Sequence, residues 1–249
     1  MKKIIGVIPS RMGSGRFPGK PLFKIAGMPM LEHVWHRAKM YKKWDELLVA
    51  TCDVEIKDFA DSKNIPCVMT SDKHERALDR VAEAIENSDF EVNEDDIVLN
   101  VQGDEPMMSP NAINQVASNL IKSGMSVATL CEKIESEESY FDLNCVKVVY
   151  NSRGNALYFS RSPIPAFRNS SEINLDFCFR HVGLYAYRVS FLKQYLQMGK
   201  SELELAEKLE QLTILNQGID INVDISCAPT GYGVDTEFDL KKVKEELKK

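Results

Sequence analysis

The stretch Lys3-Ile-Ile-Gly-Val-Ile8 runs directly into Pro9-Ser-Arg-Met-Gly-Ser-Gly-Arg-Phe-Pro-Gly-Lys-Pro21. Its apolar first part is too short for a core helix and is typical of a buried strand. The following loop carries three glycines, two arginines and a lysine. A basic, glycine-rich loop at the carboxyl end of the first strand of an α/β sheet suits a polyphosphate. A solvated surface loop is the alternative, because neither common phosphate-binding glycine pattern is present.

Strand-like and helix-like segments alternate after this loop, which predicts a mostly parallel, doubly wound α/β sheet. The predicted strands span residues 46–51, 66–70, 96–101, 127–130, 179–188 and 221–225, and a hairpin is predicted from 146–150 and 156–160. The predicted helices span residues 29–39, 54–63, 76–87, 110–122, 191–198, 203–215 and 235–249. The hairpin predicts a smaller inserted β lobe at roughly residues 130–190, within one domain of residues 1–249.

Composition excludes several classes of protein. The chain has 249 residues and is 44% hydrophobic, enough for a large core, but has no apolar run long enough to cross a membrane. Its net charge of −6 offers no general attraction to nucleic acid. The start of the chain is too short for a secretory signal, and the six cysteines lack metal-site spacing. We therefore expect reduced thiols in a cytoplasmic protein, with no membrane or nucleic-acid partner.

Three residues in the later segments could carry chemistry. Asp104 follows the apolar strand 96–101, at the sheet edge where α/β proteins bind ligands, and its carboxylate suits Mg²⁺. Capping a helix is the alternative role of Asp104, and also of Asp235, which begins an Asp-Thr-x-x-Asp pattern. His181 alternates with apolar residues along a strand, which is also typical of a core histidine.

The opening motif Pro9-Ser-Arg-x-x-Ser-x-Arg-x-Pro-Gly-Lys-Pro-Leu22 resembles that of sugar-activating nucleotidyltransferases. More closely, it is similar to that of the 3-deoxy-manno-octulosonate (Kdo) cytidylyltransferases. The resemblance covers essentially the whole chain, through Gln102-Gly-Asp-Glu-Pro106, Arg180-His-Val-Gly-Leu-Tyr185, Leu209-Glu-Gln-Leu212 and Gly231-Tyr-Gly-Val-Asp-Thr236. It implies the Rossmann-like fold of nucleotide-diphospho-sugar transferases and a homodimer.

The implied reaction joins CTP to a 3-deoxy-2-ulosonic acid, Kdo or a modified relative such as 8-amino-Kdo. The products are a CMP-sugar for surface polysaccharide, such as lipopolysaccharide, and pyrophosphate. Two alternatives stay open. One is a related transferase for a sialic-acid-like sugar or a sugar 1-phosphate, and the other is a non-catalytic nucleotide-binding relative.

The resemblance also assigns residues to the site. The catalytic set is Arg11, Arg16, Lys20, Asp104 and Asp235, with Mg²⁺ on Asp104 and Asp235. The nucleotide-binding set is Pro9, Arg11, Gly13, Ser14, Lys20, His74, Arg76, Ala77, Leu78, Arg80, Gln102 and Asp104. The sugar-binding set is Arg16, Arg80, Arg161, Arg168, His181, Tyr185, Glu210 and Gln211. Arginine suits a sugar acid because its planar guanidinium binds a carboxylate through two hydrogen bonds.

The chain departs from the family at two places. The relatives usually read His-x-Ser-Gly-Thr-Asp-Arg where this chain has His74-Glu-Arg-Ala-Leu-Asp-Arg80, and an arginine where it has Thr213. If Leu78 replaces a hydroxyl in the pocket, a substrate hydroxyl there loses its partner. Arg76 could add a hydrogen-bond donor if it points inward, whereas pointing to solvent would leave only the effect of Leu78. These changes predict that a modified ulosonic acid is used better than Kdo.

Overall fold

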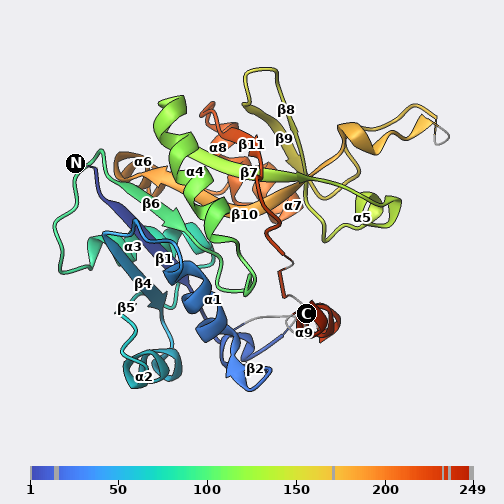
Figure 1. The fold of residues 1–249 in the computed structure, drawn as a ribbon. Coiled ribbons are helices and arrows are strands. Elements are labelled where there is room, and N and C mark those ends of the chain that lie inside the picture. The colour runs from blue at the N-terminus through green and yellow to red at the C-terminus, as the bar shows by residue number, and fades with distance from the viewer. Residues whose placement is uncertain (1, 14–16, 170–171, 232, 235–236, 247–249) are drawn as a thin grey trace.

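The computed structural model describes residues 2–13, 17–169, 172–231, 233–234 and 237–246. In this part of the chain, one nine-stranded sheet forms the centre of the molecule, with strand order β11-β7-β10-β6-β1-β4-β5 and the pair β8–β9 attached to β10 (Figure 1). Its strands are β1 (Ile4–Pro9), β4 (Glu46–Thr51), β5 (Cys67–Met69), β6 (Ile97–Asn100), β7 (Val127–Lys133), β8 (Lys147–Tyr150), β9 (Ala156–Ser160), β10 (Phe179–Arg188) and β11 (Asn222–Ile225).

The strand directions confirm the predicted mainly parallel α/β sheet. β1 pairs in parallel with β4 and β6, β4 with β5, and β11 with β7. β10 lies antiparallel between β6 and β7, and it also contacts β8 at Arg180. β1 is therefore central, and the loop that follows it begins in the middle of the carboxyl edge of the parallel strands.

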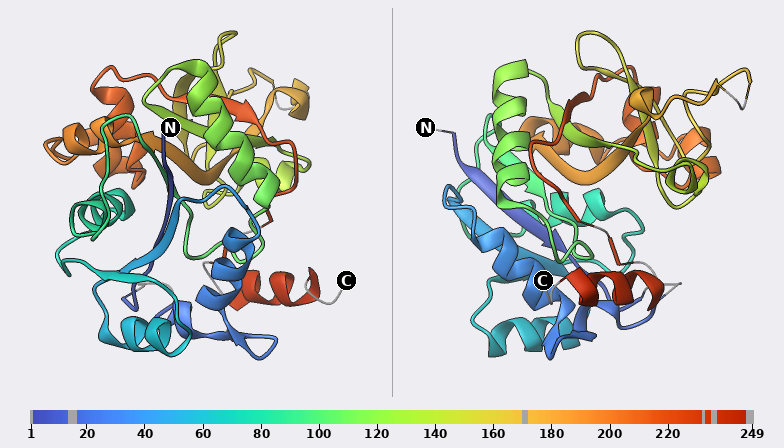
Figure 2. Two further views of the ribbon diagram at one scale, coloured as in Figure 1. Left: turned by 60° about the vertical axis from the view of Figure 1, so that its left-hand side comes forward. Right: turned by 45° about the vertical axis from the view of Figure 1, so that its right-hand side comes forward.

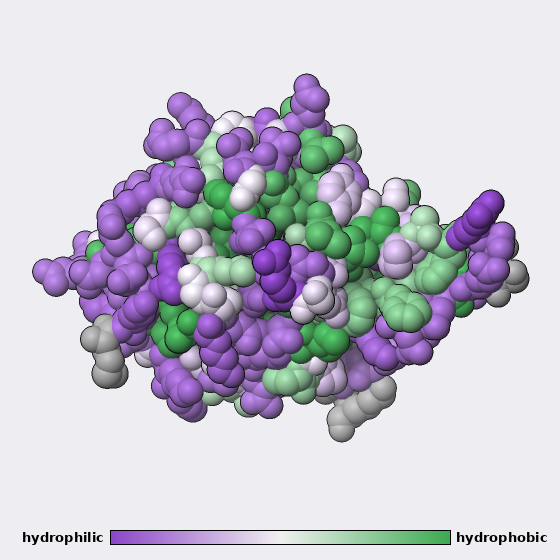
Figure 3. Space-filling view, turned by 90° about the horizontal axis from the view of Figure 1, so that it is seen from above, coloured by the Kyte–Doolittle hydropathy of each residue, from purple (hydrophilic) through white to green (hydrophobic). Residues whose placement is uncertain are grey.

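Helices cover both faces of the sheet, as expected for a doubly wound fold (Figure 2). The side chains of β1 alternate between two cores, because Ile5 and Val7 pack with α3 on one face while Ile8 packs with α1, α2 and α4 on the other. These helices are α1 (Met30–Lys39), α2 (Val54–Ser62), α3 (Ala77–Glu86) and α4 (Pro110–Ser123). The outer surface seen in Figure 3 is mostly hydrophilic, with hydrophobic residues gathered near its middle.

The region predicted as an inserted lobe contributes to two parts of the molecule. β7 and β10 lie in the central sheet, whereas β8 and β9 form the predicted antiparallel hairpin beside it. Helix α5 (Glu137–Phe141) and the 3₁₀ helix Leu175–Phe177 contribute to a separate small core around Ile134, Tyr140 and Cys178. Three further short elements were not predicted: a 3₁₀ helix at Lys20–Leu22, β2 (Lys24–Ile25) and β3 (Met28–Pro29).

The C-terminal third follows the hairpin with four helices. α6 (Val189–Tyr195) and α9 (Glu237–Glu246) lie within predicted segments or close to them. The single helix predicted over 203–215 is wrong, because the chain forms α7 (Glu202–Glu207) and α8 (Gln211–Asn216). Lys208 adopts a left-handed conformation with φ of 54° between them, and the continuous apolar spacing of this segment does not reveal that break.

Two further findings concern membrane segments and thiols. None of the helices in the described ranges is long and apolar enough to cross a membrane. All six cysteines lie in the described part of the chain, and none of them is in a disulfide.

Candidate active site

The loops that follow β1 and β6 meet at the carboxyl edge of the sheet. A Cβ at Gly103 would lie 2.5 Å from the carbonyl oxygen of Pro9, so only glycine allows this approach. The basic loop is also held from the other side, because the amide of Met12 donates to Asp53 Oδ2 at 2.7 Å, just beyond β4. The start of the predicted phosphate-binding loop is thus held at Pro9 by the close approach of Gly103 and at Met12 by the hydrogen bond to Asp53.

Lys20 and Asp104 form an ion pair at this edge. The Lys20 Nζ lies 2.9 Å from Asp104 Oδ2, and their side chains are 11% and 32% exposed. Asp104 is not a helix cap, because Ser109 caps α4 by accepting from the amide of Asn111. The backbone carbonyl of Asp104 accepts the amide of Val234 at 2.9 Å, which brings the second acidic motif to the first. The predicted residues Ser14, Arg16 and Asp235 lie outside the described residues.

A cavity of about 150 Å³ opens at the same edge of the sheet. Its lining residues come from the ends of β1 and β6 and from the start of α3. They are Pro9, Ser10, Arg11, His74, Glu75, Arg76, Ala77, Arg80 and Gln102. All but Ser10 and Glu75 belong to the predicted nucleotide-binding set, so the structure brings most of that set together. Gly13 is exposed and is not part of this lining.

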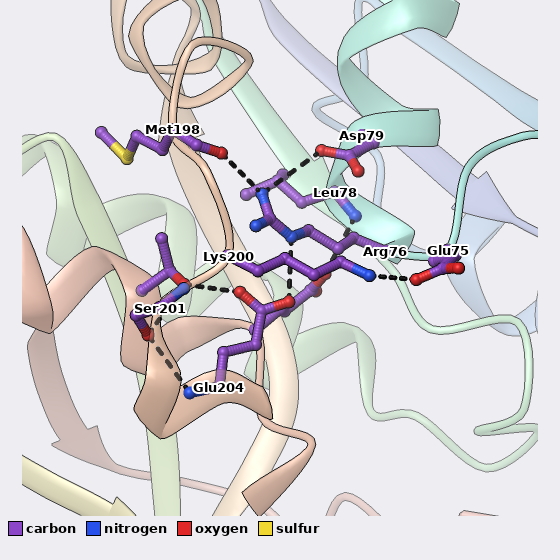
Figure 4. Close-up of polar contacts among 10 residues, drawn as sticks. Glu75, Arg76, Leu78, Asp79, Met198, Lys200, Ser201 and Glu204 are labelled. Atoms are coloured by element: carbon purple, nitrogen blue, oxygen red, sulfur yellow. Dashed lines mark hydrogen bonds and ion pairs between the residues drawn. The ribbon is translucent and has the colours of Figure 1, made fainter. Parts of the chain in front are cut away.

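Arg76 points into the protein, away from solvent (Figure 4). Its Nε donates to Glu204 Oε1 at 2.9 Å, and its Nη1 donates to the carbonyl of Met198 at 3.1 Å. Glu204 also accepts the hydroxyl of Thr213 at 2.5 Å. We call Arg76, Glu204 and Thr213 the Arg76 cluster. It joins both positions at which the chain departs from the family pattern, and it ties the start of α3 to α7 and α8.

The side chain of Leu78 does not line this cavity. It is fully buried in the core beneath α3. Only the backbone amide of Leu78 contacts a predicted site residue, because it donates to Glu210 Oε2 at 3.3 Å. The expectation that Leu78 would leave a substrate hydroxyl unpaired is therefore wrong. The amphipathic period of α3 places position 78 on its core-facing side, whatever the residue.

A second cavity, of about 350 Å³, lies on the other side of the segment Glu75–Ala77. It is lined by Glu75, Arg76, Ala77, Lys200, Glu204, Leu205, Lys208, Leu209, Glu210 and Gln211. Glu210 and Gln211 are predicted sugar-binding residues, and burial raises the pKa of the Glu210 carboxyl to about 7. Residues 75–77 therefore separate a cavity lined by predicted nucleotide contacts from one lined by predicted sugar contacts.

His181 and Tyr185 lie along β10 and line neither of these cavities. The His181 ring packs edge-on against Phe159 and lies 5.2 Å from the Tyr185 ring, and its Nε2 is 3.3 Å from Thr129 Oγ1. Burial lowers the pKa of His181 to about 3, so its ring is neutral at physiological pH. These contacts favour the core-histidine alternative, and a role in sugar binding stays a prediction.

Arg161 and Arg168 are also separate from the two cavities. Arg161 Nε donates to the carbonyl of Glu207 at 2.7 Å, and its Nη1 to that of Leu143 at 3.1 Å. Arg168 is exposed in the loop after β9. Arg80 does reach the first cavity, where its guanidinium donates to the hydroxyl of Thr70 at 2.5 Å.

Comparison with known proteins agrees with this geometry. A family model described as cytidylyltransferase matches residues 5–221. The 3-deoxy-manno-octulosonate cytidylyltransferase of Ruthia magnifica is 46% identical over 241 residues, covering 97% of this chain and 98% of the relative. That of Hahella chejuensis is 44% identical over 253 residues, covering 98% and 97%. The chain belongs to the 3-deoxy-manno-octulosonate cytidylyltransferase family.

Solved structures of related proteins share the fold of this chain. A structure of CMP:2-keto-3-deoxy-manno-octonic acid synthetase complexed with CTP matches with a TM-score of 0.89 and 40% identity, covering 99% of both chains. The 4-diphosphocytidyl-2C-methyl-D-erythritol synthase of Anaerococcus prevotii matches with a TM-score of 0.66 at 16% identity, which shows a shared fold alone. The predicted fold class is confirmed.

The residues of this cytidylyltransferase site fit a Mg²⁺ ion bound together with phosphates. Mg²⁺ commonly takes one or two carboxylates and fills its other positions with water and substrate phosphates. Asp104 offers a partly exposed carboxylate, and the amide of Val234, directly before Asp235, is bonded to its carbonyl. Within the described ranges no group of three or more acidic, histidine or cysteine side chains forms a metal site without a substrate.

Sequence reasoning missed three charged residues of the second cavity: Lys200, Glu204 and Lys208. Lys200 forms an ion pair with Glu75 across the cavity, and Glu204 holds Arg76. None of the three lies in a recognisable motif. The one available signal for Glu204 is a charged residue at a position of α7 that faces the core.

Proposed function

We propose that this protein transfers the cytidylyl group of CTP to Kdo and releases pyrophosphate. A cavity at the carboxyl edge of the sheet, lined by most of the predicted nucleotide-binding set, is the observation that carries this proposal. The names of the relatives, and the solved relative complexed with CTP, support it.

In the proposed reaction, CTP occupies the cavity at Pro9–Arg11 and Arg80, with its phosphates toward the basic loop, and the sugar acid occupies the cavity at Glu210. The anomeric hydroxyl attacks the α-phosphorus, a new P–O bond forms, and the bond to the leaving pyrophosphate breaks. Lys20 carries its charge at the point where negative charge develops on the phosphates. Mg²⁺, held by Asp104 and Asp235, would offset further phosphate charge. Positioning and electrostatics then supply the rate enhancement.

A screen of pyrophosphate release tests this proposal and its alternatives. CTP, UTP, GTP and ATP are each combined with Kdo, a sialic acid and a sugar 1-phosphate in the presence of Mg²⁺. We expect turnover only with CTP and Kdo. Turnover with another nucleotide or acceptor would identify a related transferase, and no release from any pair would identify a non-catalytic relative.

The identity of the best ulosonic acid is a separate question. With Leu78 in the core, the predicted preference for a modified acid rests on Arg76, which lines both cavities, and on Thr213. The ratio of kcat/KM for Kdo and an amino-substituted Kdo, measured in the wild type and in Arg76→Ser, tests it. A wild-type preference for Kdo that the variant leaves unchanged would contradict this prediction.

We further propose that the enzyme acts as a homodimer in the cytoplasm. Phe141, Leu143 and Phe177 are 52%, 60% and 62% exposed, and side chains of this kind suit a subunit contact. Light scattering should then give twice the chain mass of 28.2 kDa. The unpaired thiols and the net charge of −6 support a cytoplasmic enzyme without nucleic-acid or membrane partners, which cell fractionation can test.

A further inference from the structure

An ion pair in the central sheet holds the segment that leads to the second acidic motif. Arg180 on β10 contacts the Glu132 carboxylate on β7, the neighbouring strand. The same Arg180 Nη2 donates to Thr230 Oγ1 at 3.2 Å and to the carbonyl of Gly231 at 3.0 Å. Glu132 Oε1 accepts both the amide and the hydroxyl of Thr230, each at 2.8 Å. We call Glu132, Arg180 and Thr230 the Thr230 clamp.

The other end of this segment is fixed to the loop of Asp104. The amide of Val234 donates to the carbonyl of Asp104 at 2.9 Å, and the Val234 side chain is fully buried in a small core. Gly231 has φ of +82°, and a Cβ there would lie 2.7 Å from the Cβ of Met107. Gly231 and Val234 therefore lie against the Asp104 loop, an approach that glycine permits at position 231 and that the clamp secures at Thr230.

The side chains of the Thr230 clamp are largely shielded from solvent. Arg180 and Glu132 are 24% and 19% exposed, and Thr230 is 2% exposed. Lys133, the next residue on β7, forms an ion pair with Asp176, and the two side chains are 55% and 72% exposed. A pair on the same strand thus provides a matched control.

We propose that Glu132 and Arg180 are positioning residues that hold Thr230, Gly231 and Val234 against the Asp104 loop and so keep the Asp104 carboxylate in place for a divalent cation. The inference rests on the proposed function, because it takes Asp104 as a metal ligand. The two side chains act through the backbone of Thr230 and Gly231. Residues that orient metal ligands typically change metal affinity by about 10–100-fold when they are replaced.

The test measures metal binding directly as well as activity. Mn²⁺ is titrated into the protein saturated with a non-hydrolysable CTP analogue and followed by electron paramagnetic resonance, for the wild type, Arg180→Met, Glu132→Gln and the control Lys133→Met. We expect the first two variants to bind Mn²⁺ about 10–100-fold more weakly, and to need correspondingly more Mg²⁺ for half-maximal pyrophosphate release. Arg180→Lys, which keeps the charge and loses the planar geometry, should fall between them and the wild type. Lys133→Met should match the wild type.

Several outcomes would overturn the inference. These are unchanged Mn²⁺ affinity in Glu132→Gln and Arg180→Met, an equal loss in Lys133→Met, or a wild type without a measurable Mn²⁺ site. Glu132→Gln is the milder change and serves if Arg180→Met does not fold. If the wild type binds Mn²⁺ but turns over no nucleotide, the proposed function fails, while the comparison of Mn²⁺ affinities still decides the role of the clamp.

Discussion

Two ion pairs belong to the candidate active site, and their surroundings differ. The Asp104 carboxylate, paired with Lys20, is 32% exposed, whereas the Arg76 and Glu204 side chains are 6% and 8% exposed. Arg76 also bonds the carbonyl of Met198, and Glu204 also accepts from Thr213. A carboxylate open to solvent can exchange its lysine partner for a metal ion, whereas a buried pair held by further hydrogen bonds fixes the positions of helices. The difference separates residues suited to chemistry from residues suited to shaping the site.

The largest expected effect comes from the more exposed ion pair, Lys20–Asp104. Asp104→Asn should abolish turnover, with a fall in kcat of at least about 10³-fold, because it removes a carboxylate from the metal. Asp235→Asn should do the same. Circular dichroism should show a retained fold for both. Near-normal rates at saturating Mg²⁺ in either variant would remove that residue from the metal site.

Changes to the buried ion pair, Arg76–Glu204, should lower the stability of the fold. Arg76→Met leaves Glu204 as a buried charge without its cation, and breaking such a pair costs about 3–5 kcal/mol. The free energy of unfolding in urea measures this loss. The double variant Arg76→Met/Glu204→Leu, which removes both charges, should recover much of it. A single variant as stable as the wild type would mean that the Arg76 cluster does not fix α3 to α7.

Lys20→Ala sharpens the contrast, because its effect should fall on catalysis alone. Losing one preorganised donor costs about 2.7–4 kcal/mol of transition-state stabilisation, or 10²–10³-fold in rate. Arg16→Ala should behave similarly. Steady-state kinetics measures this effect, and the melting temperature serves as the control. An unchanged kcat/KM would return this loop to the surface-loop alternative.

The smallest expected effect concerns pH and Glu210, the residue directly before α8. Burial raises the pKa of Glu210 to about 7 in the folded protein, against about 4.3 for an unfolded glutamate. The folded state therefore holds its proton more tightly, and this stability is present below about pH 4.3 and is lost as the pH rises toward 7. One pKa unit corresponds to about 1.4 kcal/mol, or a few degrees in melting temperature.

Glu210→Gln, which cannot ionise, tests this directly. Its melting temperature should fall less than that of the wild type between pH 5 and pH 7.5. Parallel curves for the two proteins would show that the Glu210 carboxyl is not perturbed in the folded state.

Some features were determined by local sequence alone. The strand at 46–51 forms over the predicted residues, and the helices at 29–39 and 110–122 form within one residue of the predicted bounds. Apolar periodicity and turn residues are local signals, so they predict such elements without reference to distant residues. The motifs at residues 9–11, 74–80 and 102 follow β1, β5 and β6, so the parallel sheet brings them to one cavity.

Other features were decided only by tertiary structure, because they depend on residues distant in the chain. The sequence predicts Arg76 as a nucleotide contact, but its guanidinium forms an ion pair with Glu204, which lies 128 positions away in the chain. The break at Lys208 divides a segment whose apolar spacing is continuous. The Thr230 clamp joins β7, β10 and the segment before Asp235, none of which carries a local signal for the others. Sequence patterns determined which residues could react, and packing between distant segments decided which of them are exposed to react.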